Sequence, residues 1–463
     1  MRTGSPLRNL GQTMATAVAL ALAIPAGPTF AQQPAIQTSD AMDLAAIHNA
    51  AVQAFARGEW AAAIDGLVKV IKMVTDPKDQ QKIGPIYYTL GAAYFNAKNY
   101  PKAGETFTAY LTKYPNAERV GEARLALARS KFLNNDYAGA AALFAQLEAT
   151  PALREQSLLA QAACFKELNQ PDKQIGVLEK LIAPEIKTSV QASGALTLAE
   201  LLIDKKDDAK VLDLLNKLHA RIALVENVVA LNALTVNLGD QLAEKKGYAQ
   251  ALAAYRVVRS RDQVIAFQND RIAAMEKRMQ TNLERTRGDA QAFMAASGAN
   301  NEIKAQQDQA KTLLAEFLKL PDYGPGILFR MAKVWYEWDK KWEAIVAFDY
   351  LLNQYAAAPE REPALYSTLI CYADLNRVPR TIQLCDRYLA EFPKGANATT
   401  VGYLKGAAAL ESGDPKAAAS FFGTMLEKQP DSQFREQMRF LLGNAHIVQG
   451  QFDEANKDYV RYL

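Results

Sequence analysis

Cysteine and histidine are both scarce in this chain, which has three of each among 463 residues. An odd and sparse set of cysteines does not build a disulfide scaffold. The histidines (His48, His219 and His446) have no carboxylate or cysteine at ligand spacing, so we expect no metal. The sequence also lacks a phosphate-binding glycine loop, a dinucleotide fingerprint and a Gly-x-Ser-x-Gly elbow. We therefore expect no cofactor, no catalytic residues and no enzyme activity.

The cysteines are expected to be structural. Cys164 and Cys371 occupy the same position in a repeated pattern, where small residues pack. This favours small buried side chains with free thiols. A bridge between Cys371 and Cys385, joining two helices of one repeat, is the alternative.

An excess of either charge is also missing, because 53 Lys and Arg face 50 Asp and Glu. A net charge of +3 argues against a nucleic-acid-binding protein, which usually has a strongly basic face. Long apolar runs are missing too, and no stretch predicts a transmembrane segment.

One short apolar run, Met14–Ile24, follows Arg2 and Arg8 and precedes small residues. This order is typical of a secretory signal peptide. We predict a signal over residues 1–31, cleavage after Ala31, and a periplasmic or secreted protein. A buried N-terminal helix is the alternative.

The most regular stretch is Ile86–Pro115, which predicts two short amphipathic helices joined by a polar turn at Asn96–Asn99. One face of the first helix holds Tyr87, Leu90, Gly91 and Tyr94, and one face of the second holds Ala103, Phe107, Tyr110 and Leu111. The small residues Gly91 and Ala103 allow the helices to approach closely.

This pattern resembles the tetratricopeptide repeat (TPR), a helix–turn–helix unit of about 34 residues. The ending AYLTKYP is similar to the bacterial envelope variant found in Tol–Pal-associated and outer-membrane-assembly TPR proteins. The resemblance implies an all-α, right-handed α-solenoid whose concave surface binds a protein or peptide partner.

The position of Ala103 recurs along the chain, mostly as alanine. Its equivalents are Ala63, Ala140, Gln174, Val211, Ala251, Ala344, Thr381, Ala418 and Ala455. We therefore predict about ten helical hairpins, in TPR-like repeats over 32–258 and again over 323–463. Gln174 and Val211 depart from the pattern. The last repeat ends within its second helix, so we expect either a fragment of a longer protein or an end that rests on a partner.

Between Ala251 and Ala344 the spacing is much longer than one repeat, and two arms show apolar residues at alternating steps of three and four. A Gly/Asn break at 297–300 separates the arms. This favours an inserted antiparallel coiled-coil hairpin over 259–322. Its seam is diluted by Gln and Asn, so we expect it to need a partner surface, with self-association as one option.

Four aromatic residues recur at one position of the last four first helices: Phe329, Tyr366, Tyr403 and Phe440. We name them the aromatic ladder. Tyr88 is their equivalent in the repeat Ile86–Pro115. By resemblance to TPR proteins they would face the concave groove, with Lys333, Tyr336 and Asn444 beside them. The alternative is that the rings pack on the preceding repeat.

Three of the four tryptophans lie close together, at Trp335, Trp338 and Trp342. Trp335 is expected in the core. Trp338 and Trp342 are expected to clamp the inserted hairpin to the solenoid, or to meet a partner.

The combined prediction is an exported, non-enzymatic scaffold that binds protein or peptide partners in cell-envelope assembly, division or secretion. One alternative is a structural oligomer assembled through the inserted hairpin. The other is the repeat region of a longer envelope enzyme or polysaccharide-export component.

Overall fold

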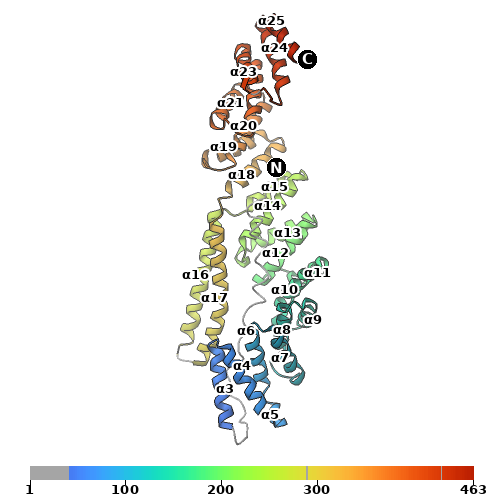
Figure 1. Ribbon diagram of the computed structural model, residues 1–463, viewed down its shortest axis with the longest axis vertical. Coiled ribbons are helices and arrows are strands. Elements are labelled where there is room, and N and C mark those ends of the chain that lie inside the picture. The colour runs from blue at the N-terminus through green and yellow to red at the C-terminus, as the bar shows by residue number, and fades with distance from the viewer. Residues whose placement is uncertain (1–40, 288–289, 429, 463) are drawn as a thin grey trace. The chain divides into compact units, whose positions relative to one another are not determined.

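The computed structural model describes residues 41–287, 290–428 and 430–462, and within these ranges the chain forms 23 α-helices, one short 3-10 helix and no strand (Figure 1). The predicted signal peptide lies outside the described residues. By Cα proximity the chain divides into two compact units. Unit 1 comprises Met1–Leu238 and Asp262–Pro321, and unit 2 comprises Gly239–Arg261 and Asp322–Leu463.

Twenty of the helices form ten helix–turn–helix hairpins, as the sequence predicts. In chain order they are α3 (Ala41–Ala56) with α4 (Trp60–Met73), α6 (Gly84–Asn96) with α7 (Tyr100–Lys113), α8 (Val120–Leu133) with α9 (Tyr137–Gln146), α10 (Pro151–Glu167) with α11 (Pro171–Ile182), α12 (Ser189–Asp204) with α13 (Asp208–Ala220), α14 (Val228–Glu244) with α15 (Tyr248–Val257), α18 (Gly324–Glu337) with α19 (Lys341–Gln354), α20 (Arg361–Asp374) with α21 (Val378–Glu391), α22 (Ala398–Glu411) with α23 (Pro415–Lys428), and α24 (Arg435–Val448) with α25 (Phe452–Tyr462).

The remaining elements are α5 (Pro77–Gln80), the 3-10 helix Ile222–Leu224, and the long helices α16 (Arg261–Arg285) and α17 (Ala290–Leu318). Within each unit successive hairpins pack on one another, for example α7 on α8 in unit 1 and α21 on α22 in unit 2.

The backbone confirms the repeat register independently of side-chain type. Every hairpin turn holds one residue with positive φ, always five positions before the residue equivalent to Ala103. These residues are Gly58, Lys98, Asn135, Asn169, Lys206, Lys246, Asp339, Asn376, Gly413 and Gly450. A left-handed residue ends the first helix and reverses the chain. All ten equivalents of Ala103, including Gln174 and Val211, are buried.

The two helices of a hairpin meet where a small residue on the first helix faces a large one on the second. At Gly91, Gly239, Gly406 and Gly443 an added Cβ would lie no more than 2.8 Å from a ring carbon, of Phe107, Tyr255, Phe422 and Tyr459 respectively. At the same register five other hairpins place alanine opposite Leu or Phe. In the hairpin α20–α21 the order reverses, because Leu369 stands opposite Cys385 and both are fully buried. The combined volume of the two facing side chains is therefore similar from one hairpin to the next.

Helices α16 and α17 lie side by side within unit 1 (Figure 1), and polar side chains connect them. The Gln307 amide donates to Glu276 at 2.8 Å and to the Ile272 carbonyl at 3.3 Å. The Asn300 amide donates to the Met279 carbonyl at 2.9 Å and accepts from Asn282 at 2.8 Å. The Gln307, Asn282 and Asn300 side chains are thus paired between the two helices, so these three need no partner surface to satisfy them.

The predicted break at 297–300 is wrong, because these residues lie inside α17. Asn300 reads as a turn residue in the sequence, but its amide is used between the helices. Of two adjacent glutamines in α17, Gln307 is buried (1% exposed) and Gln306 is exposed. Helix α16 instead ends at Arg285, and α17 begins at Ala290.

The close approach of helices predicts opposite effects for two helical glycines of the hairpin α22–α23. Gly406→Ala places a methyl group against Phe422, so we expect a net loss of about 1–3 kcal/mol of unfolding free energy. A Cβ added at Gly423 would have no heavy atom of a neighbouring residue within 4 Å. Gly423→Ala should therefore stabilise by up to about 1 kcal/mol, the ordinary helix-propensity gain. Urea unfolding followed by circular dichroism tests the pair, and equal shifts in one direction would contradict this packing.

Candidate functional site

The aromatic ladder lies on the first helices of unit 2, and three of its four rings are half-buried. Phe440 is the most open, at 44% exposure. Each ring contacts an aromatic ring on the second helix of its own hairpin. Centroid distances are 5.6 Å from Phe329 to Phe348, 6.3 Å from Tyr366 to Tyr388, 6.4 Å from Tyr403 to Phe422 and 5.9 Å from Phe440 to Tyr459. Each ring therefore packs against its own hairpin and keeps only part of its surface accessible.

One ladder residue also contacts the next repeat. Tyr403 stacks on Phe434, with centroids 4.8 Å apart and planes within 10°. Phe434 directly precedes α24 and joins the hydrophobic cluster of the last two hairpins. The ladder thus has a packing role within the solenoid in addition to its exposed edges.

Tyr88 differs from the ladder residues, since it is 2% exposed. Its ring meets Phe107 and Tyr110, and the Arg119 guanidinium lies 3.9 Å from the ring centroid. Burial raises the pKa of the Tyr88 hydroxyl to about 12, and this hydroxyl lies 3.4 Å from Glu122. Tyr88 is a core residue of unit 1, so we leave it out of the proposed surface.

The polar neighbours of the ladder have different environments. Lys333 is exposed and forms an ion pair with Glu337 at 3.5 Å. The Tyr336 hydroxyl donates to Asp374 at 2.8 Å, which links α18 to α20. Burial, followed by this bond, raises the pKa of Tyr336 to about 12. The Asn444 carbonyl oxygen accepts from the Tyr459 hydroxyl at 2.6 Å, so one polar atom of Asn444 is already used within its hairpin.

A further polar cluster of unit 2 was not predicted from the sequence. The Tyr255 hydroxyl donates to Asp240 at 2.6 Å, and Arg330 Nε donates to the same carboxylate at 3.0 Å. Burial and the Asp240 charge raise the pKa of Tyr255. The cluster joins α14 and α15 to α18. In the sequence, α14 and α15 precede α16 and α17, whereas α18 follows them. The pair Tyr459–Asn444 has the same spacing as Tyr255–Asp240, and this is the signal that could have found the cluster.

The tryptophans pack within unit 2. Trp335 and Trp338 stack with centroids 5.8 Å apart, and Trp338 also meets Tyr248 at 6.1 Å. Trp342 meets the edge of Tyr372 at 6.1 Å and is 49% exposed. The predicted clamping of the inserted helices stays a prediction.

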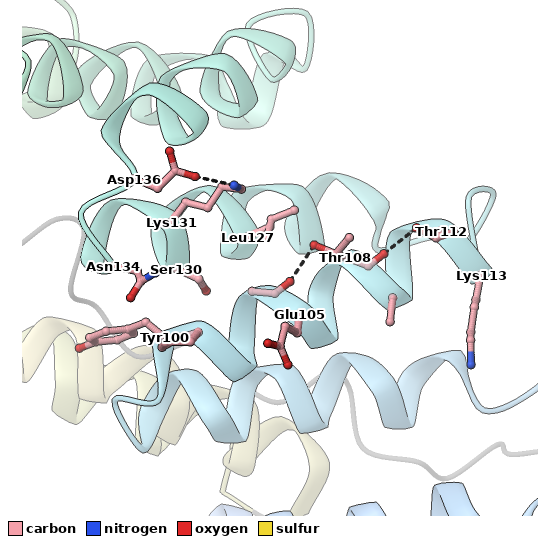
Figure 2. Close-up of a pocket in the computed structure, with 13 residues that line it drawn as sticks. Tyr100, Glu105, Thr108, Thr112, Lys113, Leu127, Ser130, Lys131, Asn134 and Asp136 are labelled. Carbon is pink, nitrogen blue, oxygen red and sulfur yellow. Dashed lines mark hydrogen bonds and ion pairs between the residues drawn. The ribbon is translucent and has the colours of Figure 1, made fainter.

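A cavity of unit 1 lies between α7 and α8 (Figure 2), with a volume of about 580 Å³. Small residues at Gly104 and Ala109 leave it open, and Tyr100 and Lys113 lie at its two ends. Its hydroxyl groups bond to their own helix, as Thr108 does to the Gly104 carbonyl at 2.8 Å. Its ion pair joins Lys131 to Asp136, which caps α9. These contacts give the cavity a structural rather than a reactive character.

All three cysteines are free and buried, so the alternative of a Cys371–Cys385 bridge is wrong. Cys385 fills the place that a large residue takes in the other hairpins. Within the described ranges no group of His, Cys, Asp or Glu could hold a metal ion. No helix there is long and apolar enough to cross a membrane.

Comparison with known families decides what the hairpins are. The model of the tetratricopeptide repeat matches residues 86–117, which cover most of α6 and all of α7. Residues 86–117 therefore form a tetratricopeptide repeat. The left-handed turn recurs in the other nine hairpins, and the small-to-large contact recurs in eight of them, because α20–α21 reverses its order. No curated protein matches.

Solved structures with similar helices include three that differ widely in setting. They are the Naa15/Naa10 complex bound to HypK-THB (14% identity, TM-score 0.30, covering 90% of this chain and 68% of that one), the C-terminal part of a TPR repeat-containing protein from Cytophaga hutchinsonii (12%, 0.36, 67% and 97%) and the TPR domain of P58(IPK) (14%, 0.23, 88% and 99%). TM-scores this low support no inference about function.

The cysteines yield a test of the unit 1 and unit 2 cores. Burial raises the pKa of the Cys164, Cys371 and Cys385 thiols to about 12. The thiolate is the reactive form, so a thiol reagent at pH 8 should modify none of them in the native protein. In denaturant all three should react. Rapid modification of any cysteine without denaturant, seen by mass spectrometry, would contradict the buried positions.

Proposed function

We propose that this TPR protein is a non-enzymatic scaffold that holds a protein or peptide partner along the aromatic ladder of unit 2. The observation that carries the proposal is the ladder itself: Phe329, Tyr366, Tyr403 and Phe440 repeat at one register and keep accessible ring edges. Aromatic side chains with few rotatable bonds contribute much of the affinity at protein interfaces. TPR units commonly present such positions to a partner.

The ladder face is ordered before any partner arrives. Aromatic residues of the second helices pack against the rings, and Tyr336 links α18 to α20 through its hydrogen bond to Asp374. A preorganised surface loses little side-chain entropy on binding. Lys333 adds one exposed cation beside the rings, and this favours a partner segment that carries an apolar side chain and a nearby carboxylate.

Export and a role in envelope assembly, division or secretion form a second part of the proposal. They are supported by the pattern of residues 1–31 and by the resemblance of the opening repeat to envelope TPR proteins. We also propose that α16 and α17 pack as an antiparallel coiled coil. An oligomer built through these helices has less support, since their polar seam is internally paired and Gln268 and Arg271 bond to the Glu226 carbonyl of unit 1.

The ladder predicts a loss of binding when two anchors are removed. Tyr366→Ala combined with Tyr403→Ala should weaken capture of the native partner at least about tenfold, because each anchor contributes about 1 kcal/mol or more. The partner is first identified by a photo-crosslinking residue at position 440, which is exposed on the ladder.

Position 460 on α25 is a matched control, because Val460 is 65% exposed but lies on a second helix. The double variant loses packing against Tyr388 and Phe434, so its helicity must be checked at the assay temperature. Equal crosslinking from positions 440 and 460, or full capture by the folded double variant, would reject the ladder as the binding face.

The export proposal predicts a specific mature N-terminus. Expressed in a Gram-negative bacterium, the chain should appear in the periplasmic fraction and begin at Gln32. Arg2→Glu combined with Arg8→Glu should reduce export, because the positive region before the apolar run is then lost. Cytoplasmic protein that retains residues 1–31 would contradict export while leaving the ladder proposal intact.

A further inference from the structure

An exposed apolar strip runs along α19, on a second helix and therefore away from the ladder. Trp342, Val346 and Tyr350 follow one another at four-residue steps and are 49%, 69% and 54% exposed. We name these three residues the α19 ridge. In the nine other hairpins the equivalent positions hold alanine, glycine, proline, polar or charged residues, with Val257 as the single large apolar one. The ridge is thus a property of one repeat and not of the repeat pattern.

Folding does not explain the ridge. The buried side of α19 consists of Ala344, Ile345, Phe348, Leu351 and Leu352, and the ridge lies on the opposite side. Exposed Val346 and Tyr350 gain nothing from the core, and exposed apolar groups on a helix are usually replaced by polar ones. A contiguous strip of this kind is typical of a surface that becomes covered.

The shape of the ridge fits another helix. Residues at four-residue steps form a straight row of knobs, and such rows pack into the grooves of a second helix in the commonest class of helix packing. Three residues span about 12 Å, which matches two turns of a partner helix.

The charge beside the ridge is positive on one side. The Arg377 guanidinium lies 5.9 Å from the Trp342 ring centroid, and that of Arg380 lies 5.7 Å from the Tyr372 ring centroid. Neither has a salt bridge within 4.0 Å in the described part of the chain. Both lie at the start of α21, whose first turn has no acidic residue, so the positive end of the helix dipole adds to their charge.

The carboxylates near the ridge compensate this charge only in part. Asp349, a half-buried residue of α19, interacts with Arg380 and Arg387, and burial raises its pKa despite them. Asp339 is paired with Lys341 at 2.8 Å. Glu343 directly follows Trp342 in the sequence and is exposed. It lies on the edge of α19 away from Asp349. Acidic groups of a partner would therefore be favoured along the α21 edge alone.

We propose that the α19 ridge binds an amphipathic helix of a partner protein that carries carboxylates along the edge facing α21. The apolar residues of that helix cover Trp342, Val346 and Tyr350, and its carboxylates pair with Arg377 and Arg380. This site is separate from the ladder and does not depend on the ladder proposal.

Two synthetic helical peptides of about 18 residues, long enough to form a helix on binding, test the proposal with the full chain. They share one leucine stripe and differ only in having Glu or Lys along its edges. Measured by fluorescence anisotropy at low salt, the Glu peptide should bind at least about tenfold more tightly than the Lys peptide. Arg377→Ala with Arg380→Ala should reduce that preference to less than about threefold.

Val346→Asp should abolish binding of the Glu peptide, whereas the matched change Val460→Asp on α25 should leave it unchanged. Tyr366→Ala with Tyr403→Ala, once its helicity is shown to be intact, should also leave it unchanged, which separates this site from the ladder. Absence of binding, equal affinity for the two peptides, or undiminished binding by the Val346→Asp variant would each overturn the proposal.

Discussion

The structure depends on the close approach of two helices within each hairpin. A glycine or alanine on the first helix lies under a large side chain of the second, and at four glycines no methyl group fits beneath the ring. Interiors are packed as densely as organic crystals, so the two residues must add up to a fixed volume. The reversed pair Leu369 and Cys385 shows that this sum is kept when the individual residues change.

This contact fixes the register of every hairpin, and the register decides what remains outside. A ring that stands on a glycine cannot slide along the helix, and the left-handed turn residue sets where the second helix begins. The ladder residues then stand at the edge of the core, and each ring is part of both packing and surface. The α19 ridge stands opposite the core, and of its three residues only Trp342 contacts another ring, that of Tyr372. Substitutions in the ladder therefore change folding and binding together, whereas substitutions in the ridge separate them.

The repeat period, the ten hairpins and the position of the insertion could be predicted from the sequence, because each depends on residue size at a regular spacing. The turn between α16 and α17 could not, since Asn300 has the composition of a turn but its amide bonds across the helix pair. Tyr88 shares its register with the ladder but is covered by Arg119 and Glu122, which lie at the start of the next hairpin. The ridge has a sequence signal of its own, because the equivalent positions of the other second helices hold small, polar or charged residues, apart from Val257.

The insertion is tolerated because the repeats on its two sides still pack directly in unit 2. Helix α15 contacts α18. The hydrogen bonds among Asp240, Tyr255 and Arg330 also connect these two hairpins, although they are not consecutive in the chain. The Tyr323 hydroxyl donates to the Arg259 carbonyl at 2.5 Å, so the two ends of the inserted segment are held together. Closing a loop costs free energy that rises only slowly with its length, so a long helical insert adds little to the cost of a short one.

The hairpin that follows the insertion, α18–α19, carries three of the four tryptophans and the ridge. The repeat that departs from the others in the exposed surface of its second helix is therefore the one that follows the inserted helices.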